Sequence, residues 1–139
     1  MKQRVPISEI MTQELITISP VDDLVTAEEL FKKHRIRHIP VVQGDEILGI
    51  LSYTDLLRIS FADAIGPDEE EVETIVYNMF SIEQVMAKNV ISVPLNATIK
   101  EVAEFLAKQE FHALPVVDQG KLVGIVTTTD LIQYLVNQY

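Results

Sequence analysis

Two similar octapeptides, GILSYTDL and GIVTTTDL, contain the side chains of this sequence that are best suited to hold a polar ligand. Each places a hydroxyl residue, Ser52 or Thr127, three positions before an aspartate, Asp55 or Asp130. A carboxylate that accepts two hydrogen bonds, a hydroxyl group beside it and the free N–H groups of a helix start suit a sugar diol and phosphate oxygens. The repeated pattern therefore predicts two places where a small polar molecule binds.

The threonine that precedes each aspartate offers a purely structural explanation of the same motif. Thr54 and Thr129 can act as helix N-caps, and the aspartate that follows can complement the helix dipole from the first turn. That explanation gives Ser52 and Thr127 no task, so both hypotheses stay open. If the motif binds a ligand, we expect the binding residues to be Ser52, Thr54 and Asp55 in the first copy and Thr127, Thr129 and Asp130 in the second.

A basic cluster, FKKHRIRH, precedes the first motif. Its residues 32–35 fall in the last turn of an expected helix, where cations suit the helix dipole and lie in solvent. Arg37 and His38 lie beyond that helix and directly before an apolar strand, where a positive charge has no structural task. They are either phosphate contacts or an exposed strand end. The corresponding position in the second half is His112, which is followed by an alanine.

The whole chain is organised as an internal repeat. A shift of 75 residues aligns 7–60 with 82–135 without a gap, and thirteen positions are identical. Each copy reads as strand, helix, strand, strand and helix, with caps at Asp23 and Thr98 before the first helix. The expected strands are 15–19, 38–42 and 47–51 in the first copy and 90–94, 113–117 and 122–126 in the second. Neither copy is long enough to bury its own apolar face, so we expect the two to pack as a pseudo-twofold pair.

This order of elements, with IPVV and LPVV, a turn that contains glycine and then the G-h-h-[ST]-x-x-D string, resembles the cystathionine β-synthase-type (CBS) domain. The resemblance implies an α/β fold of two tandem repeats, 1–60 and 82–139. It also implies a regulatory module without catalytic residues that binds AMP, ADP or ATP in clefts between the repeats. Asp55 and Asp130 would hold the ribose, and Arg37 and His38 the phosphates, while His112 would make a weaker phosphate end. Across the pseudo-twofold, Asp130 and Thr127 would share one cleft with Arg37 and His38, and Asp55 and Ser52 would face His112 in the other.

The resemblance further implies a homodimer that regulates an unknown protein target, or a module of the same fold that binds no ligand and only pairs with other proteins. The apolar helix positions that we expect to cover one another between two copies are Leu24, Leu30, Leu57, Val102, Leu106 and Leu135. The connector 61–81 has six acidic residues and no Lys or Arg. Its apolar spacing predicts a short amphipathic helix, which either packs on its own module or docks another protein.

Composition argues against several other functions. The net charge is −10 and aromatic residues make up 6%, which disfavours binding to nucleic acid. There is no cysteine, no glycine-rich phosphate loop and no H-E-x-x-H pattern, so we expect neither an enzyme nor a metal site. No apolar run approaches the roughly 20 residues that a membrane span needs, so we expect a cytoplasmic protein. We also expect that the protein requires no cofactor.

Overall fold

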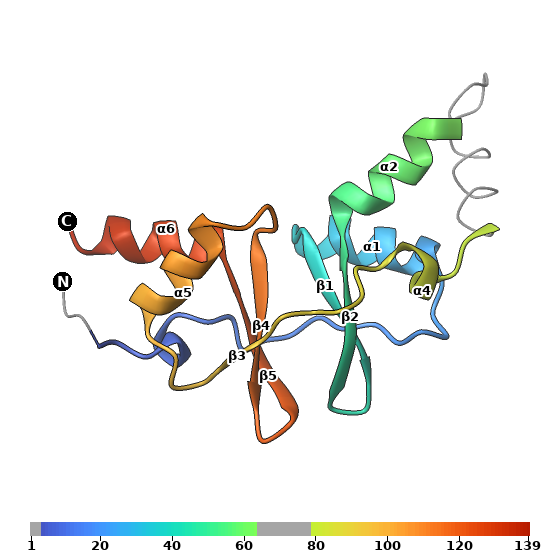
Figure 1. The fold of residues 1–139 in the computed structure, drawn as a ribbon. Helices are drawn as coiled ribbons and strands as arrows, with labels where there is room; N and C mark the ends of the chain where they lie inside the picture. The colour runs from blue at the N-terminus through green and yellow to red at the C-terminus, as the bar shows by residue number, and fades with distance from the viewer. Residues whose placement is uncertain (1–3, 64–78) are drawn as a thin grey trace. The chain divides into compact units, whose positions relative to one another are not determined.

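The computed structural model describes residues 4–63 and 79–139, and these form two compact units (Figure 1). We call the unit made of 16–63 and 79–89 the first-repeat unit, and the unit made of 4–15 and 90–139 the second-repeat unit. Within these ranges no helix combines the length and the apolar character that a membrane span requires. The expected mixed α/β class with two repeated halves is confirmed.

The first-repeat unit contains a two-stranded antiparallel sheet with helices packed against it. The strands pair from His38 opposite Ser52 at one end to Gln43 opposite Glu46 at the other, with a bulge at Val41 and Val42. In chain order its elements are α1 (Leu24–His34), β1 (His38–Gln43), β2 (Glu46–Ser52), α2 (Tyr53–Asp63) and α4 (Ile82–Val85).

The second-repeat unit contains a three-stranded sheet in the order β3-β4-β5. β3 runs parallel to β4, and β4 pairs with β5 in the same antiparallel register that β1 and β2 use, including the bulge. Its elements are η1 (Ile7–Glu9), β3 (Val93–Pro94), α5 (Ile99–Ala107), β4 (Ala113–Asp118), β5 (Lys121–Thr127) and α6 (Thr128–Asn137). The two units thus share a hairpin that runs directly into a helix.

The first helix of each repeat begins at the cap that the sequence predicts. The Asp23 carboxylate accepts a hydrogen bond from the Thr26 backbone N–H at 2.8 Å, and the Thr98 hydroxyl accepts one from the Glu101 N–H at 3.1 Å. The bonds that Thr26 donates favour the charged carboxylate and hold the pKa of Asp23 below its usual value. α1 ends at Arg35, whose left-handed backbone (φ 54°) donates its N–H to the Phe31 carbonyl.

Each unit includes the first residues of the other repeat. Ile7 is fully buried in the core of the second-repeat unit, and Ile82, its counterpart, is fully buried in the core of the first-repeat unit. The two cores are built from Ile18, Leu24, Ala27, Phe31, Ile39, Val41, Leu51 and Leu56 in the first case, and from Ala97, Ile99, Val102, Leu106, Leu114, Val116 and Val126 in the second. The compact units therefore combine residues from both halves of the chain.

Backbone hydrogen bonds hold these exchanged segments in place. Ala87 and Ile50 exchange a pair of N–H···O bonds at 2.8 and 3.1 Å, and Thr12 and Ile125 exchange a pair at 2.8 and 3.0 Å. Both pairings are antiparallel. Each hairpin thereby gains a short stretch of backbone along one side.

Glycine is required where these segments cross the hairpins. A Cβ atom at Gly49 would lie 2.6 Å from the Met86 Sδ and 2.7 Å from the Ala87 carbonyl oxygen. At Gly124 it would lie 2.5 Å from the Met11 Sδ. The glycine and methionine that the sequence repeats are therefore the two sides of one close packing contact, present once in each unit.

The first predicted strand of each repeat is shorter than expected. In 15–19 only Ile18 pairs, through a parallel bridge to Val41, and a turn follows in which the Asp22 N–H donates to the Ser19 carbonyl at 3.0 Å. In 90–94 only Val93 and Pro94 form a strand, β3. The four strands of the two hairpins, in contrast, are confirmed to within one residue at each end.

The residues expected to cover one another between two copies divide into three groups, of which the first is Leu30, partly buried against the core of the first-repeat unit. Leu24, Val102 and Leu106 are buried in the cores of their own units, so the expectation is wrong for them. Leu57 and Leu135 are exposed, at 38% and 45%, and remain available to a partner. The expected helix of the acidic connector falls mainly on 64–78, which lie outside the described residues.

Candidate functional site

The hydroxyl residues of the repeated motif cap the helices that follow the hairpins. The Ser52 Oγ accepts a hydrogen bond from the Asp55 N–H at 3.0 Å, and the Thr127 Oγ1 accepts one from the Asp130 N–H at 3.2 Å. In α6 the Asp130 carboxylate also accepts from the Thr127 N–H at 3.0 Å, which completes a capping box. The motif thus has a structural role, and it is played by the hydroxyl residue at the strand end.

Thr54 and Thr129 are not the caps, which corrects the structural explanation given from the sequence. α2 begins at Tyr53 and α6 at Thr128, so both threonines lie inside the first turn. Both side chains are exposed, and among the described residues neither hydroxyl makes a hydrogen bond. Their hydroxyl groups are therefore open to a ligand at a helix N-terminus.

The two aspartates differ in their partners. The Asp55 Oδ1 lies 3.3 Å from the Arg58 Nη1, and its side chain is 28% exposed. Asp130 is half-buried and holds the cap of α6. Because an ionised carboxylate offers about four acceptor positions, both can accept further hydrogen bonds from a ligand.

A backbone hydrogen bond places Arg37 beside the start of α2. The Arg37 carbonyl accepts from the Tyr53 N–H at 2.8 Å, and the His112 carbonyl accepts from the Thr128 N–H at 3.0 Å in the other unit. His38, the first residue of β1, lies opposite Ser52 in the hairpin. Each unit therefore gathers its own expected site residues around one helix N-terminus: Arg37, His38, Ser52, Thr54 and Asp55 in the first-repeat unit, and His112, Thr127, Thr129 and Asp130 in the second.

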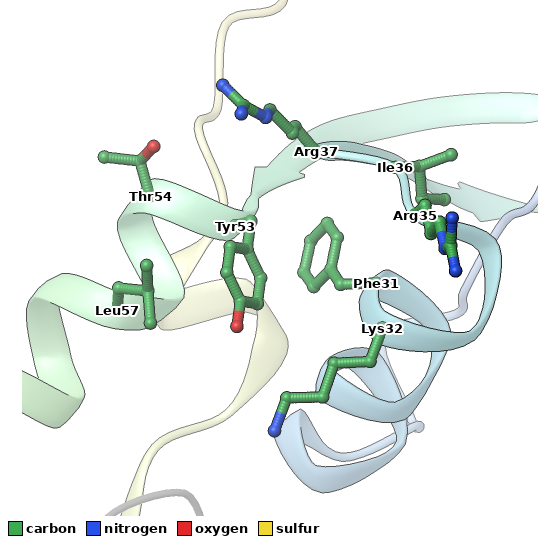
Figure 2. A pocket seen from close by; sticks show the side chains of 8 residues that line it. All are labelled: Phe31, Lys32, Arg35, Ile36, Arg37, Tyr53, Thr54 and Leu57. Atoms are coloured by element: carbon green, nitrogen blue, oxygen red, sulfur yellow. The ribbon is translucent and has the colours of Figure 1, made fainter.

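A hollow of about 510 Å³ opens next to this point in the first-repeat unit. Figure 2 shows the side chains that line it, which come from the end of α1, the loop to β1 and the start of α2. They are Phe31, Lys32, Arg35, Ile36, Arg37, Tyr53, Thr54 and Leu57. Of these, only Arg37 and Thr54 are residues that the sequence singled out for ligand binding.

Two of the other lining residues, Lys32 and Arg35, belong to the basic cluster, which the sequence pattern places in the last turn of the helix. The aromatic part of the lining, a Phe31–Tyr53 pair with ring centroids 5.2 Å apart, had no recognisable signal. Across the described ranges, no three His, Asp or Glu side chains gather as metal ligands would.

The chain belongs to the CBS domain family, which matches residues 7–62 and again 82–137. A relative from Thermofilum pendens, a 33.4 kDa protein in the ribosomal RNA operon, is 31% identical over 132 residues. That match takes in 94% of this chain but 44% of the relative, so the chain spans less than half of that protein's length.

Solved structures of CBS proteins share this fold. The structure of CBSX2 in complex with AMP has a TM-score of 0.79 and 22% identity, and the match covers 96% of this chain and 97% of that one. The CBS domain pair of protein MJ0100, solved with 5′-methylthioadenosine and S-adenosyl-L-methionine, has a TM-score of 0.79 and 24% identity, covering 97% and 98%.

Proposed function

We propose that this CBS domain pair is a regulatory module that senses an adenosine nucleotide of the AMP, ADP or ATP class. The observation that carries the proposal is the set of polar groups around the start of α2, where the open Thr54 hydroxyl, the Asp55 carboxylate and the Arg37 side chain lie on adjoining backbone. A diol suits the carboxylate, and a phosphate suits the helix N-terminus with its hydroxyl and guanidinium.

The start of α6 supports the same kind of ligand with a different balance of charge. There the Asp130 carboxylate and the Thr129 hydroxyl are present, and His112 takes the place of the arginine. The proteins whose structures share this fold include one solved with AMP and one solved with two adenosine derivatives. Adenosine is the part that these three ligands have in common, so it is the group for which we propose recognition here.

We also propose that the module pairs with a second copy, and the same surface would serve a protein target. The supporting observation is an apolar stretch on α6 in which Ile132, Leu135 and Val136 are 60%, 45% and 59% exposed. Large apolar side chains grouped on one exposed helix are typical of a contact surface. A module that binds no ligand and acts only through this surface is the second candidate function.

Calorimetric titration and thermal unfolding of the whole chain with adenosine, AMP, ADP and ATP test the first proposal. A ligand that binds the folded state raises its stability by about 2.7 kcal/mol at a hundredfold excess over Kd. No shift and no heat with any of the four compounds would leave the interaction module as the function.

Two conservative variants locate the site. Asp55→Asn and Asp130→Asn keep the size of the side chain and one acceptor oxygen, and each removes the second acceptor that a diol uses. We expect at least one of the two variants to bind the ligand about tenfold or more weakly than the wild type. This corresponds to the 1.5–3 kcal/mol that a hydrogen bond to a charged group contributes. Asp118→Asn, an exposed carboxylate at the end of β4, is the matched control and should bind as the wild type does.

A further inference from the structure

The hollow in the first-repeat unit has a cationic lining. Lys32, Arg35 and Arg37 contribute three positive charges, and none of the eight lining residues is acidic. Glu28 compensates one of these charges through an ion pair with Lys32 at 3.1 Å. Among the described residues, Arg35 and Arg37 have no carboxylate partner. The hollow therefore has a surplus of positive charge in a chain whose net charge is −10.

The equivalent positions of the second repeat lack this charge. The shift of 75 residues replaces Lys32 by Ala107, Arg35 by Glu110 and Arg37 by His112. The backbone bond that ties the loop to the following helix is present in both units, so the scaffold is the same in both. At these three positions the basic residues belong to the first repeat alone, so they are not needed to build the fold.

The cations are spread around the hollow and do not converge on one point. In Figure 2 the Arg37 guanidinium and the Thr54 hydroxyl lie above the Phe31–Tyr53 pair, and the Lys32 ammonium lies below it. The two rings meet edge to face at 65°. Because Phe31 is 2% exposed, the core holds this aromatic pair in place. An extended anion can contact several of these cations at once, whereas a single phosphate group can reach only some of them.

We propose that this hollow binds the polyphosphate chain of a nucleoside di- or triphosphate, with Lys32 and Arg35 contacting the phosphates farthest from the sugar. The inference deepens the proposed function by naming the ligand class of the first-repeat unit. Thr54 connects the two, because it lies both among the expected ligand residues and in the lining of the hollow. Phosphate groups suit this lining because lysine and arginine donate charge-assisted hydrogen bonds to them.

Titration calorimetry at two salt concentrations tests the proposal, with adenosine, AMP, ADP, ATP and inorganic tripolyphosphate as the probes. We expect affinity to rise from AMP to ADP to ATP, and the ATP affinity to fall more steeply with added salt. Lys32→Gln and Arg35→Asn should each weaken ATP about two- to fivefold, as for an exposed ion pair, and should leave AMP unchanged. Asparagine is chosen at position 35 because it tolerates the left-handed backbone there.

Two control variants separate the hollow from general charge. Lys33→Gln removes an exposed cation from the same helix turn that does not line the hollow, and it should leave the ATP-to-AMP ratio as in the wild type. Glu28→Gln removes the carboxylate that pairs with Lys32 while the cation stays, so ATP should bind as tightly or more tightly.

The outcomes of this titration separate the two proposals. Equal affinity for AMP and ATP, or an ATP preference that survives Lys32→Gln with Arg35→Asn, would overturn the role of the hollow and leave adenosine sensing intact. Tripolyphosphate binding that these two variants weaken, with no binding of adenosine or AMP, would support the anion site and remove the adenosine proposal. An ATP preference that Lys33→Gln abolishes equally would show that the effect is one of net charge, and it would overturn the inference.

Discussion

Replacing each repeated glycine by alanine should cost different amounts of stability in the two units. An added methyl group at Gly49 meets the Ala87 carbonyl oxygen at 2.7 Å as well as the Met86 side chain. At Gly124 the backbone oxygen of Thr12 is 3.1 Å away, and the close contact is the flexible Met11 Sδ. A side chain can rotate away from the new methyl group, whereas a backbone carbonyl cannot.

The expected magnitudes follow from this difference. The Ala87 carbonyl accepts one of the two backbone hydrogen bonds that join Ala87 to Ile50, so a shift of this carbonyl strains the pairing. Overpacking of this kind costs about 1–3 kcal/mol of stability. Replacing a strand glycine by alanine also stabilises the fold by about 0.5–1 kcal/mol, because the unfolded chain loses conformational entropy. We therefore expect Gly49→Ala to lose about 1–2 kcal/mol and Gly124→Ala to lose less than about 1 kcal/mol.

A double-mutant cycle measured by urea unfolding checks the cause of each loss. Gly124→Ala in a Met11→Ala background should be within about 0.5 kcal/mol of Met11→Ala alone, because the clashing side chain is gone. Gly49→Ala in a Met86→Ala background should remain about 1 kcal/mol or more below Met86→Ala, because the carbonyl stays. Equal losses at the two glycines, or full relief by Met86→Ala, would refute this reasoning.

Three further predictions concern single side chains. Ser52→Ala should lower the unfolding free energy by about 1 kcal/mol through loss of the cap, and Thr54→Ala by less than about 0.5 kcal/mol; the reverse order in urea unfolding would contradict the assignment. The fold favours the charged form of Asp23, so the stability that this carboxylate contributes is present above pH 3.8 and is lost as the pH falls through the lowered pKa. Asp23→Asn should keep the cap but make the urea midpoint fall less at acid pH, and a pH profile identical to that of the wild type would contradict this. Leu57→Glu or Leu135→Glu should convert a dimer to the 15.7 kDa monomer in sedimentation equilibrium, and a wild type that is monomeric at tens of micromolar would disprove the pairing.

The hairpins and the first helix of each repeat could be predicted because their signals are local. Continuous apolar runs interrupted by a turn define β1, β2, β4 and β5, and both turn glycines, Gly44 and Gly120, have the positive φ that such turns require. Asp23 and Thr98 were recognised as caps because each directly precedes an apolar helical pattern. In each case the deciding contacts lie within a few residues along the chain.

The sequence pattern places the caps after the hairpins two residues too late, because no loop separates the strand from the helix. Thr127 is the last residue of β5 and also the N-cap of α6, because its extended backbone (φ −119°, ψ 165°) suits a strand and a cap equally. Ser52 plays the same part between β2 and α2. A sequence pattern that treats the strand and the cap as separate positions shifts the helix start toward Thr54.

The exchange of segments between the repeats could not be predicted, because the residues involved are the same in both copies. Ile7 and Ile82 are identical and occupy equivalent positions, so either could fill either core. The same equivalence makes the charged residues informative, since Lys32 and Arg35 differ from their counterparts Ala107 and Glu110 on a shared backbone. Apolar identity between the copies therefore accounts for the common fold, while the difference in charge is the basis of the ligand that we propose for the first-repeat unit.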